Sequence, residues 1–414
     1  MRRLAVYLAG AAVGDLEQDD SGLLKFRYRP EWLARDGASA LSRSLPLQGT
    51  AFRGRYARAF FAGILPEEEP RRRIASILGV SERNDFALLE RLGGECAGAV
   101  SLLPEGAAPP ATGEARVREL SDGDLRRIVT ELPDRPLLAG EDGLRLSLAG
   151  AQDKLPVVVL DGRVALPLGD TPSTHIIKPE PLRFPGLAAN EFFCMTLAKA
   201  VGLKVAEVKR FAVGDKPCLL LQRYDRTVAS DGTVTRIHQE DFCQALGFPP
   251  EHKYQQEGGP LLRDCVALLR EWSTAPVLDL RDFIDGQIFN VLIGNADAHG
   301  KNYSMLYQGG QRRLAPFYDL VCTLAWPELS KTPAMKIGGC ASLDVFTAAP
   351  WQKMAQEARL GWPMIRERME ALCAQVIDTL RGSAMREAMT GEMEARLAAL
   401  ALERASALRA NLTR

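Results

Sequence analysis

Scarce residue types set the first limits on this sequence of 414 residues. It has four histidines and eight cysteines, and no two cysteines form a Cys-x-x-Cys pair. This pattern argues against a disulfide framework and against a transition-metal site made of protein ligands. It is typical of reduced, buried thiols in a cytosolic protein. Because no apolar run approaches the roughly 20 residues that span a bilayer, we expect a cytoplasmic protein without a membrane span.

The chain also has no net charge, because its 52 lysines and arginines balance its 52 aspartates and glutamates. A chain without a basic field is not expected to hold nucleic acid by itself. The run Arg71-Arg72-Arg73 is interpreted as the solvated start of a helix. The first residues, MRRLAVYLAG, mimic a signal peptide, but the cysteine usage favours a strand over residues 4–8 that ends at Gly10.

The order of predicted elements indicates an α+β protein of several parts. Residues 1–103 combine alternating apolar segments with two helical patterns, and a linker rich in Pro, Gly and Ala follows over residues 104–116. Ser121 and Asp124 form the capping signal of a helix, and Asp161-Gly162 is a hairpin signal between two apolar strands. Residues 117–226 are mainly strands around one helix, and residues 227–414 are mainly helical.

One loop carries the residue types that phosphoryl transfer requires. This reaction needs a cation on the phosphates, oxygen ligands for Mg²⁺ and a carboxylate that orients the attacking hydroxyl. Directly after a helix that ends at Gly294, Asp297 and Asn302 stand five positions apart, and Asp319 follows seventeen residues later. Asp297 is the candidate catalytic residue, and Asn302 and Asp319 are candidate Mg²⁺ ligands. The alternative is an ordinary polar turn with Asp319 as a helix N-cap.

Earlier residues match a nucleotide-binding role. Lys178 ends an apolar strand, where it either clamps phosphates or extends its amine to solvent. Glu191, in the first turn of the next helix, either pairs with that lysine or complements the helix dipole. The small residues of segment 147–154 would let backbone N–H groups approach phosphate oxygens, although the segment is neither G-x-G-x-x-G nor a Walker A motif. Gln222 and Tyr224 follow the second hairpin, where a kinase hinge binds adenine.

These parts follow the order of protein-kinase motifs. The order predicts a two-lobed protein-kinase-like fold with an additional small N-terminal α/β subdomain. We expect that subdomain at residues 1–103, an ATP-binding N-lobe at residues 117–226, and a mainly helical C-lobe at residues 227–414.

Seven segments in a fixed order resemble the HipA family of bacterial serine/threonine kinase toxins. They are SLAGAQDK, THIIKPE, NEFFCMTLAKAVGL, LLLQRYDR, HQEDFCQALG, GNADAHGKNYS and LAPFYDL. The resemblance covers most of the chain: residues 147–320 carry the kinase motifs, and residues 1–103 are similar to the N-terminal subdomain of full-length members. It implies ATP and Mg²⁺ as cofactors.

The resemblance also implies roles for individual residues. Asp297 matches the catalytic aspartate, and Asn302 and Asp319 match the metal ligands. Ser147 matches the serine that these kinases phosphorylate on themselves, which ejects the phosphate loop; the local alternative is a loop serine that bonds its own backbone. The residues expected at the nucleotide are Ala149, Gly150, Ala151, Gln152, Lys154, Lys178, Gln222, Tyr224 and Lys301.

Partners follow from the same resemblance. Family members are held inactive by a HipB-like helix-turn-helix antitoxin whose dimer binds operator DNA. Their known targets include aminoacyl-tRNA synthetases, whose phosphorylation causes growth arrest and drug tolerance. Two positions depart from the pattern: Gln222 stands where we expect an acidic or varied residue, and Ala296 where we expect threonine. Neither change removes a ligand.

Two other function classes stay open on the sequence alone. A degenerate kinase fold would serve only as a co-repressor with its antitoxin on DNA, although the intact Asp297, Asn302 and Asp319 argue against degeneracy. A small-molecule or lipid kinase would use the same fold. The sequence predicts no particular substrate, because the surface that selects it has no readable motif.

Overall fold

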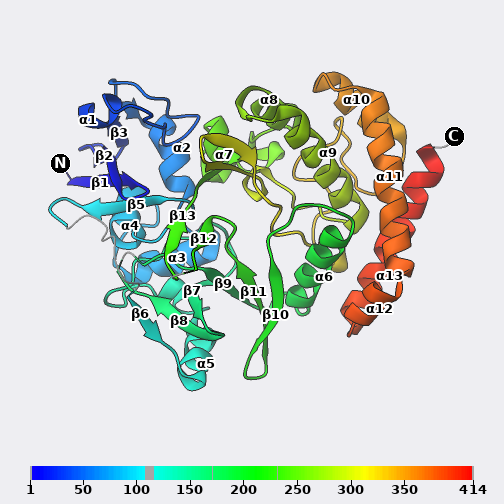
Figure 1. The fold of residues 1–414 in the computed structure, drawn as a ribbon, viewed down its shortest axis with the longest axis horizontal. Coiled ribbons are helices and arrows are strands. Elements are labelled where there is room, and N and C mark those ends of the chain that lie inside the picture. Colours follow the sequence, from blue (N-terminus) through cyan, green and yellow to red (C-terminus); the bar gives the residue numbers. More distant parts are fainter. Residues whose placement is uncertain (1, 108–115, 170, 231, 413–414) are drawn as a thin grey trace. The chain divides into compact units, whose positions relative to one another are not determined.

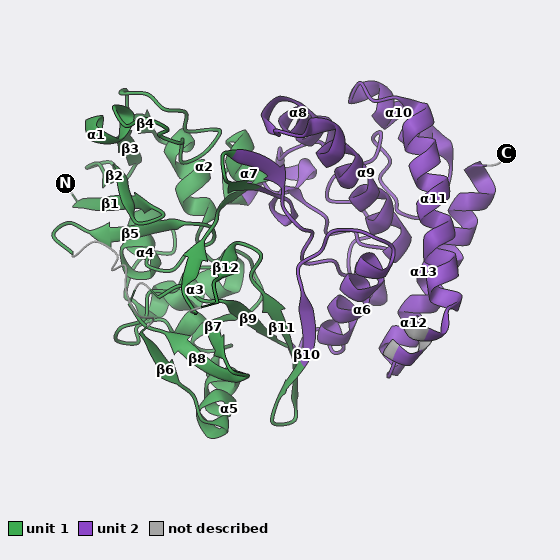
Figure 2. Cartoon of the chain, viewed as in Figure 1, with its two compact units in different colours: residues 1–179, 211–250, 306–310 green, residues 180–210, 251–305, 311–414 purple. Residues whose placement is uncertain are grey.

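The computed structural model describes residues 2–107, 116–169, 171–230 and 232–412. Figure 2 shows its two compact units. Unit 1 comprises Met1–Pro179, Phe211–Pro250 and Leu306–Gly310, and unit 2 comprises Glu180–Arg210, Glu251–Met305 and Gln311–Arg414. The segments expected at 117–226 and 227–414 therefore each contribute residues to both units. Residues 108–115 of the predicted linker lie outside the described residues.

Unit 1 begins with an antiparallel sheet in the order β4-β3-β2-β1-β5 (Figure 1). Its strands are β1 (Arg2–Leu8), β2 (Ala11–Gln18), β3 (Leu24–Tyr28), β4 (Phe52–Arg53) and β5 (Val100–Pro104). The helices beside them are α1 (Pro30–Leu33), α2 (Arg55–Gly63), α3 (Glu68–Ile77) and α4 (Asp85–Leu92). The strand predicted at residues 4–8 is confirmed within β1. The basic run lies in α3, where Arg72 and Arg73 pair with Glu69.

A second sheet follows in the order β10-β11-β9-β7-β8-β6. Its strands are β6 (Val117–Glu119), β7 (Leu155–Leu160), β8 (Arg163–Pro167), β9 (His175–Pro179), β10 (Val208–Val213) and β11 (Lys216–Gln222). The Ser121–Asp124 capping box starts α5 (Asp122–Glu131), as predicted. Asp161 and Gly162 have φ of 49° and 79°, which a two-residue hairpin turn between β7 and β8 requires. Unit 1 also contains η1 (Pro136–Leu138), β12 (Arg226–Val228), β13 (Val234–Arg236), β14 (His238–Asp241) and α7 (Phe242–Leu246).

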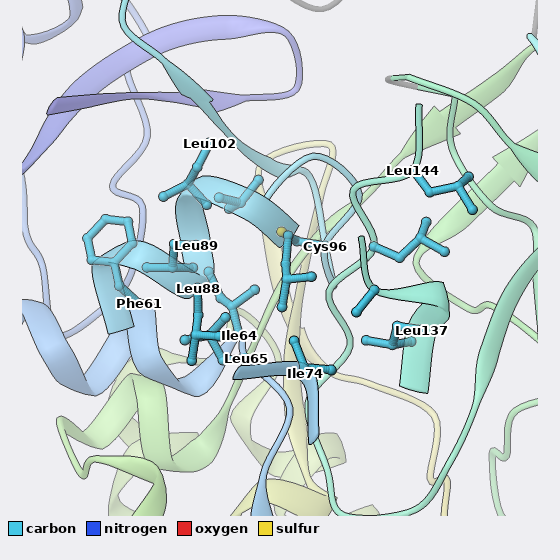
Figure 3. Packing of buried hydrophobic residues seen from close by; sticks show 14 of the residues in the cluster. Phe61, Ile64, Leu65, Ile74, Leu88, Leu89, Cys96, Leu102, Leu137 and Leu144 are labelled. Carbon is cyan, nitrogen blue, oxygen red and sulfur yellow. The ribbon is translucent and has the colours of Figure 1, made fainter. Parts of the chain in front are cut away.

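One apolar core connects the two sheets of unit 1. Figure 3 shows part of this core, with side chains from α2, α3 and α4 next to Leu137 and Leu144, which precede β7. The labelled residues, all buried, are Phe61, Ile64, Leu65, Ile74, Leu88, Leu89, Cys96, Leu102, Leu137 and Leu144. Burying a side chain of this size stabilises the fold by about 1.5–3 kcal/mol. The N-terminal 103 residues are therefore packed against the segment that leads into β7.

A buried polar cluster in unit 1 centres on Glu240 in β14. Its carboxylate accepts hydrogen bonds from Ser42 Oγ (2.5 Å), the Arg43 N–H (3.0 Å) and the Tyr307 hydroxyl. Burial raises the pKa of Glu240 to about 7, although these donors oppose the rise. The folded protein therefore holds a proton on this carboxyl at mildly acidic pH.

Unit 2 is mainly helical, as predicted for the C-terminal part. Its helices are α6 (Leu187–Ala200), α8 (Leu262–Trp272), α9 (Pro276–Ile293), α10 (Ala348–Glu357), α11 (Trp362–Arg381), α12 (Ser383–Ala388) and α13 (Glu392–Leu412). Short elements are η2 (Pro250–His252), η3 (Gln255–Glu257), η4 (Gly300–Asn302), η5 (Thr323–Ala325), β15 (Ser304–Gln308) and β16 (Gln311–Leu314). The elements η2 and β15, like strand β10 of the second sheet, cross the boundary between the units.

Helix α9 is the central element of unit 2, and it contacts α8, α11 and α13. Every residue from Phe283 to Ile293 is buried. Pro276 lies in its first turn, and Gly294 ends it with a φ of 73°, a left-handed conformation that favours glycine. At Gly286 a Cβ atom would lie 2.5 Å from the Phe317 ring. Glycine therefore lets the segment before Asp319 lie close to α9.

The thiols agree with the prediction of buried cysteines. All eight are free, seven are buried, and Cys340 is partly exposed. The mixture of helices and sheets confirms the α+β class. In the ranges that the structure describes, no helix is both long and apolar enough to cross a membrane.

Candidate active site

The candidate catalytic loop, residues 295–302, follows the end of α9 directly and is fixed by side-chain hydrogen bonds. Asn295 Nδ2 donates to Asn290 Oδ1 (2.9 Å), and Asn295 Oδ1 accepts from the Asp297 N–H (3.0 Å). The Ala296 N–H donates to Thr323 Oγ1 (2.8 Å). Position 296 lacks the expected threonine, but a hydroxyl reaches the same backbone from Thr323. These bonds fix the main chain at Asp297 and so the direction in which its side chain points.

Asp297 is exposed, and its Oδ1 accepts a hydrogen bond from the Tyr254 hydroxyl (2.8 Å). The Tyr254 ring meets the His299 ring edge-on, with centroids 5.2 Å apart. The His299 N–H donates to the Asp297 carbonyl (2.8 Å). The carboxylate is thus oriented by a phenol and remains accessible, as a base for a substrate hydroxyl must be.

Asn302 and Asp319 lie side by side, because Asn302 Nδ2 donates to Asp319 Oδ2 at 3.3 Å. Asn302 Oδ1 is buried and has no hydrogen-bond partner among the described residues. Such an acceptor costs about 1–3 kcal/mol, so it calls for an explanation. An amide oxygen beside a carboxylate is the donor set that Mg²⁺ prefers, and this ion keeps several waters and needs few protein ligands. The residues present therefore fit a Mg²⁺ site.

The backbone of Asp319 has a φ of 58°, which is uncommon outside glycine and which aspartate tolerates. Strained backbone of this kind gathers at functional sites. No α-helix begins at Asp319, and the short helix η5 has Cys322 as its N-cap. The alternative of Asp319 as a helix N-cap is therefore wrong.

Four further hydrogen bonds fix the chain on either side of Asp319. The Phe317 N–H donates to the Lys204 carbonyl (2.8 Å), and the Phe317 carbonyl accepts from the Ala206 N–H (2.9 Å). Asn190 of α6 bonds both main-chain groups of Cys322, accepting from its N–H (2.8 Å) and donating to its carbonyl (3.0 Å). The strained conformation at Asp319 is thus held from both ends.

Lys301 lies in η4, between Asp297 and Asn302, and only 8% of it is exposed. Its carbonyl accepts a hydrogen bond from the Tyr318 hydroxyl (2.7 Å). Unit 2 therefore brings together four of the predicted site residues: Asp297, Lys301, Asn302 and Asp319.

In unit 1, the predicted phosphate-binding segment, residues 147–154, precedes β7, and residues 149–154 of it form a loop. Gly150 has a φ of 108°, and its carbonyl accepts from the Glu67 N–H (3.1 Å). Lys154 Nζ donates to the Ala149 carbonyl (2.5 Å), which closes the loop on itself. The exposed or half-buried side chains of the loop are Ala149, Ala151, Gln152, Asp153 and Lys154.

The predicted phosphate lysine and hinge lie on neighbouring strands of the same unit. Lys178 of β9 is opposite Leu219 of β11 and is only 8% exposed, which argues against a lysine extended to solvent. Gln222 ends β11 with an exposed side chain, and the Tyr224 hydroxyl donates to the Gln239 side-chain carbonyl. Glu191 is buried in α6 of unit 2, and its pairing with Lys178 stays a prediction. Its predicted place in the first turn is wrong, because α6 already begins at Leu187 and has no acidic residue in that turn.

Ser147 is fully buried in unit 1. Its Oγ donates to the carbonyl of Ile64 (3.1 Å), and its N–H donates to the carbonyl of Glu95 (2.9 Å). The alternative of a loop serine bonded to its own backbone is therefore wrong. Both partners belong to residues 1–103.

Sequence reasoning missed several residues that support the site. Asn190 lies inside NEFFCMTLAKAVGL, so that segment contained a signal for it. Tyr254 and Thr323 belong to no motif, and only the folded chain brings them to Asp297 and Ala296.

Two family models and several known proteins match this chain. The model of the HipA N-terminal domain matches residues 4–103, and that of the HipA-like C-terminal domain matches residues 146–383. The putative kinase Y4mE of Sinorhizobium fredii is 49% identical over 375 residues, which cover 90% of this chain and 89% of the relative. The serine/threonine-protein kinase toxin HipA of Shewanella oneidensis is 32% identical over 346 residues, 81% of this chain and 78% of the relative.

A solved structure extends the likeness to the fold. The Shewanella oneidensis MR-1 complex of HipA, HipB and operator DNA contains a chain that matches with a TM-score of 0.83 and 28% identity. The match covers 99% of this chain and 97% of that one. It confirms the predicted kinase-like α+β fold with an additional N-terminal part.

Proposed function

This chain belongs to the HipA family of serine/threonine protein kinases, and we propose that it is the toxin of a toxin–antitoxin pair. Its proposed substrates are ATP and a serine or threonine hydroxyl of a cytoplasmic protein, with aminoacyl-tRNA synthetases as the target class that the family resemblance suggests. The proposed partner is a HipB-like helix-turn-helix antitoxin, which brings operator DNA with it. The assembly named for the Shewanella relative supports this partner.

The observation that carries the proposal is the buried Asn302 Oδ1 without a partner among the described residues, beside Asp319 and in the loop of Asp297. Bound there, Mg²⁺ would supply positive charge to the β- and γ-phosphates. Asp297 accepts a hydrogen bond from the substrate hydroxyl and turns its oxygen toward the γ-phosphorus. As the new O–P bond forms and the bond to the β–γ bridging oxygen breaks, the hydroxyl proton passes to the Asp297 carboxylate.

Unit 1 supplies the proposed nucleotide contacts. Lys178 faces the α- and β-phosphates, the N–H groups of residues 149–154 face phosphate oxygens, and the main chain from Gln222 to Tyr224 bonds adenine. Lys301 adds a positive charge from the catalytic loop. We assign residues 1–103 to an N-terminal subdomain, residues 104–116 to a linker, residues 117–226 to the ATP-binding lobe and residues 227–414 to the helical lobe.

Ser147 is the proposed site of autophosphorylation. A phosphate adds about 1.5–2 negative charges at neutral pH. The present site of Ser147 is buried against the Ile64 carbonyl and cannot solvate that charge. Phosphorylation would therefore keep the segment out of this site, and the phosphate loop that follows it would lose its geometry.

Asp297→Asn tests the reaction. With Mg²⁺, ATP and a cell lysate, we expect phosphoryl transfer to fall by about 10³-fold or more, with Mg²⁺·ATP binding nearly unchanged. Mass spectrometry should find phosphate on Ser147 in the parent only, and only the parent should arrest growth when expressed alone. Asp282→Asn, which removes a carboxylate paired with Lys204, is the matched control.

Two results would contradict the proposal in different ways. Equal transfer by Asp297→Asn and the parent would remove Asp297 from the reaction. If inactive Asp297→Asn still arrests growth, toxicity would come from a scaffold role on DNA and not from phosphoryl transfer.

A further inference from the structure

Glu95, in the loop between α4 and β5, is a carboxylate of unit 1 that is only 1% exposed and accepts hydrogen bonds on both oxygens. Its Oε1 accepts from Ser173 N (3.0 Å) and Oγ (2.9 Å), from Arg223 Nη1 (2.9 Å) and from Arg226 Nη2 (2.7 Å). Its Oε2 accepts from Arg236 Nε (3.0 Å) and Nη2 (2.5 Å). Burial opposes ionisation of this group, but the three guanidinium charges outweigh it and lower the pKa of Glu95 to about 2.

Two of these arginines flank the proposed hinge residue Tyr224. Arg223 forms a two-pronged pair with Asp225, at 2.9 Å to Oδ1 and 2.8 Å to Oδ2. Asp225 Oδ2 also accepts from the Gly98 N–H (2.7 Å), and Arg226 Nη1 donates to the Gly98 carbonyl (2.9 Å). The hinge is thus fixed on both sides by the segment that contains Glu95.

The main chain of the same residue holds the other nucleotide segment. The Glu95 N–H donates to the Arg145 carbonyl (2.8 Å), and the Glu95 carbonyl accepts from the Ser147 N–H (2.9 Å), a parallel bridge centred on Leu146. Three residues after Ser147 the phosphate loop reaches Gly150, which is bonded to the Glu67 N–H. One residue of the N-terminal subdomain therefore bonds both the hinge and the chain entering the phosphate loop.

We propose that Glu95 is a positioning residue for the nucleotide, which makes the N-terminal subdomain part of the ATP site. This rests on the proposed function, because the hinge and phosphate loop are assigned there. A buried ion cluster is weak evidence for a role in stability alone, since desolvation offsets much of its attraction. The cluster matters more for geometry, because charge-assisted, bidentate hydrogen bonds fix the orientation of the groups that they join.

Glu95→Gln tests this role, because it keeps the shape of the side chain and removes its charge. We expect the Kd of Mg²⁺·ATP, measured by calorimetry, to rise about tenfold or more, and KM for ATP to rise more than kcat falls. Asp85→Asn is the matched control, since Asp85 is a buried carboxylate of the same subdomain that pairs with Arg58 and Arg71. Its Kd should stay within about twofold of the parent's.

A second variant keeps the inference testable if Glu95→Gln does not fold. Arg236 is 12% exposed and bonds Glu95 Oε2, so Arg236→Gln removes one arm of the cluster near the surface. We expect a rise of about threefold in Kd, with an unchanged circular dichroism spectrum. A Kd for Mg²⁺·ATP equal to the parent's in folded Glu95→Gln and Arg236→Gln would overturn this inference but not the proposed function. An equal loss of Mg²⁺·ATP affinity in Glu95→Gln and Asp85→Asn would do the same. A parent that fails to bind Mg²⁺·ATP would overturn the proposed function as well.

Discussion

Asn302→Leu separates a metal ligand from a structural polar residue, because the two roles predict opposite results. Asn302 Oδ1 is buried without a partner among the described residues, and removing such an acceptor recovers about 1–3 kcal/mol. The bond from Asn302 Nδ2 to Asp319 Oδ2 is long, at 3.3 Å, and its loss costs about 0.5–1.5 kcal/mol. We therefore expect the free energy of unfolding without Mg²⁺ to stay level or to rise by about 1 kcal/mol.

Mg²⁺·ATP binding should change in the other direction. Removing one of two protein ligands should raise its Kd at least about tenfold, with little effect on ATP binding in EDTA. Urea unfolding in EDTA and calorimetry with both forms of ATP measure the two quantities. Asn411→Leu, at a half-buried amide bonded within α13, is the control. A loss of more than about 3 kcal/mol in stability together with parent-like binding of Mg²⁺·ATP would refute the reasoning.

Two more predictions concern Tyr254 and Glu240. Tyr254→Phe removes the hydroxyl that orients Asp297, so kcat should fall about tenfold at unchanged Kd for Mg²⁺·ATP; a transfer assay with unchanged kcat would exclude Tyr254. Burial raises the pKa of Glu240 from its ordinary 4.5 to about 7, so folding takes up a proton between these values. As pH rises from 4.5 through 7, the parent should lose about 3 kcal/mol of stability relative to Glu240→Gln. Thermal unfolding at pH 4.5 and 8 measures the difference, and parallel pH profiles would contradict it.

Elements with a local cause were predictable. The Ser121–Asp124 capping box, the Asp161-Gly162 turn and the end of α9 at Gly294 each depend on residues within one turn of the chain. The spacing of Asp297 and Asn302 placed them in one loop for the same reason. Strand β2 was not predicted, since its sequence, AAVGDLEQ, does not alternate; its place between β1 and β3 comes from pairing.

Contacts between distant segments had no signal in the sequence. Tyr254 lies 43 positions from Asp297, and Glu95 lies 128 positions from Arg223. A tyrosine or a glutamate in a loop carries no periodicity, and its partner is chosen by the packing of whole elements. The sequence therefore predicted the candidate site residues Asp297, Asn302 and Asp319 and missed the residues that contact them from distant segments.

Ser147 shows what such distant contacts imply for regulation. To become exposed, it must leave the Ile64 carbonyl and the Glu95 carbonyl, and Gly150 must leave the Glu67 N–H. Three hydrogen bonds at about 1 kcal/mol each correspond to a population of about one in a hundred for the released segment. All three partners belong to residues 1–103. The N-terminal subdomain thus limits how often Ser147 is exposed, and in the proposed switch the same bonds that hold the predicted phosphate loop would oppose phosphorylation of this serine.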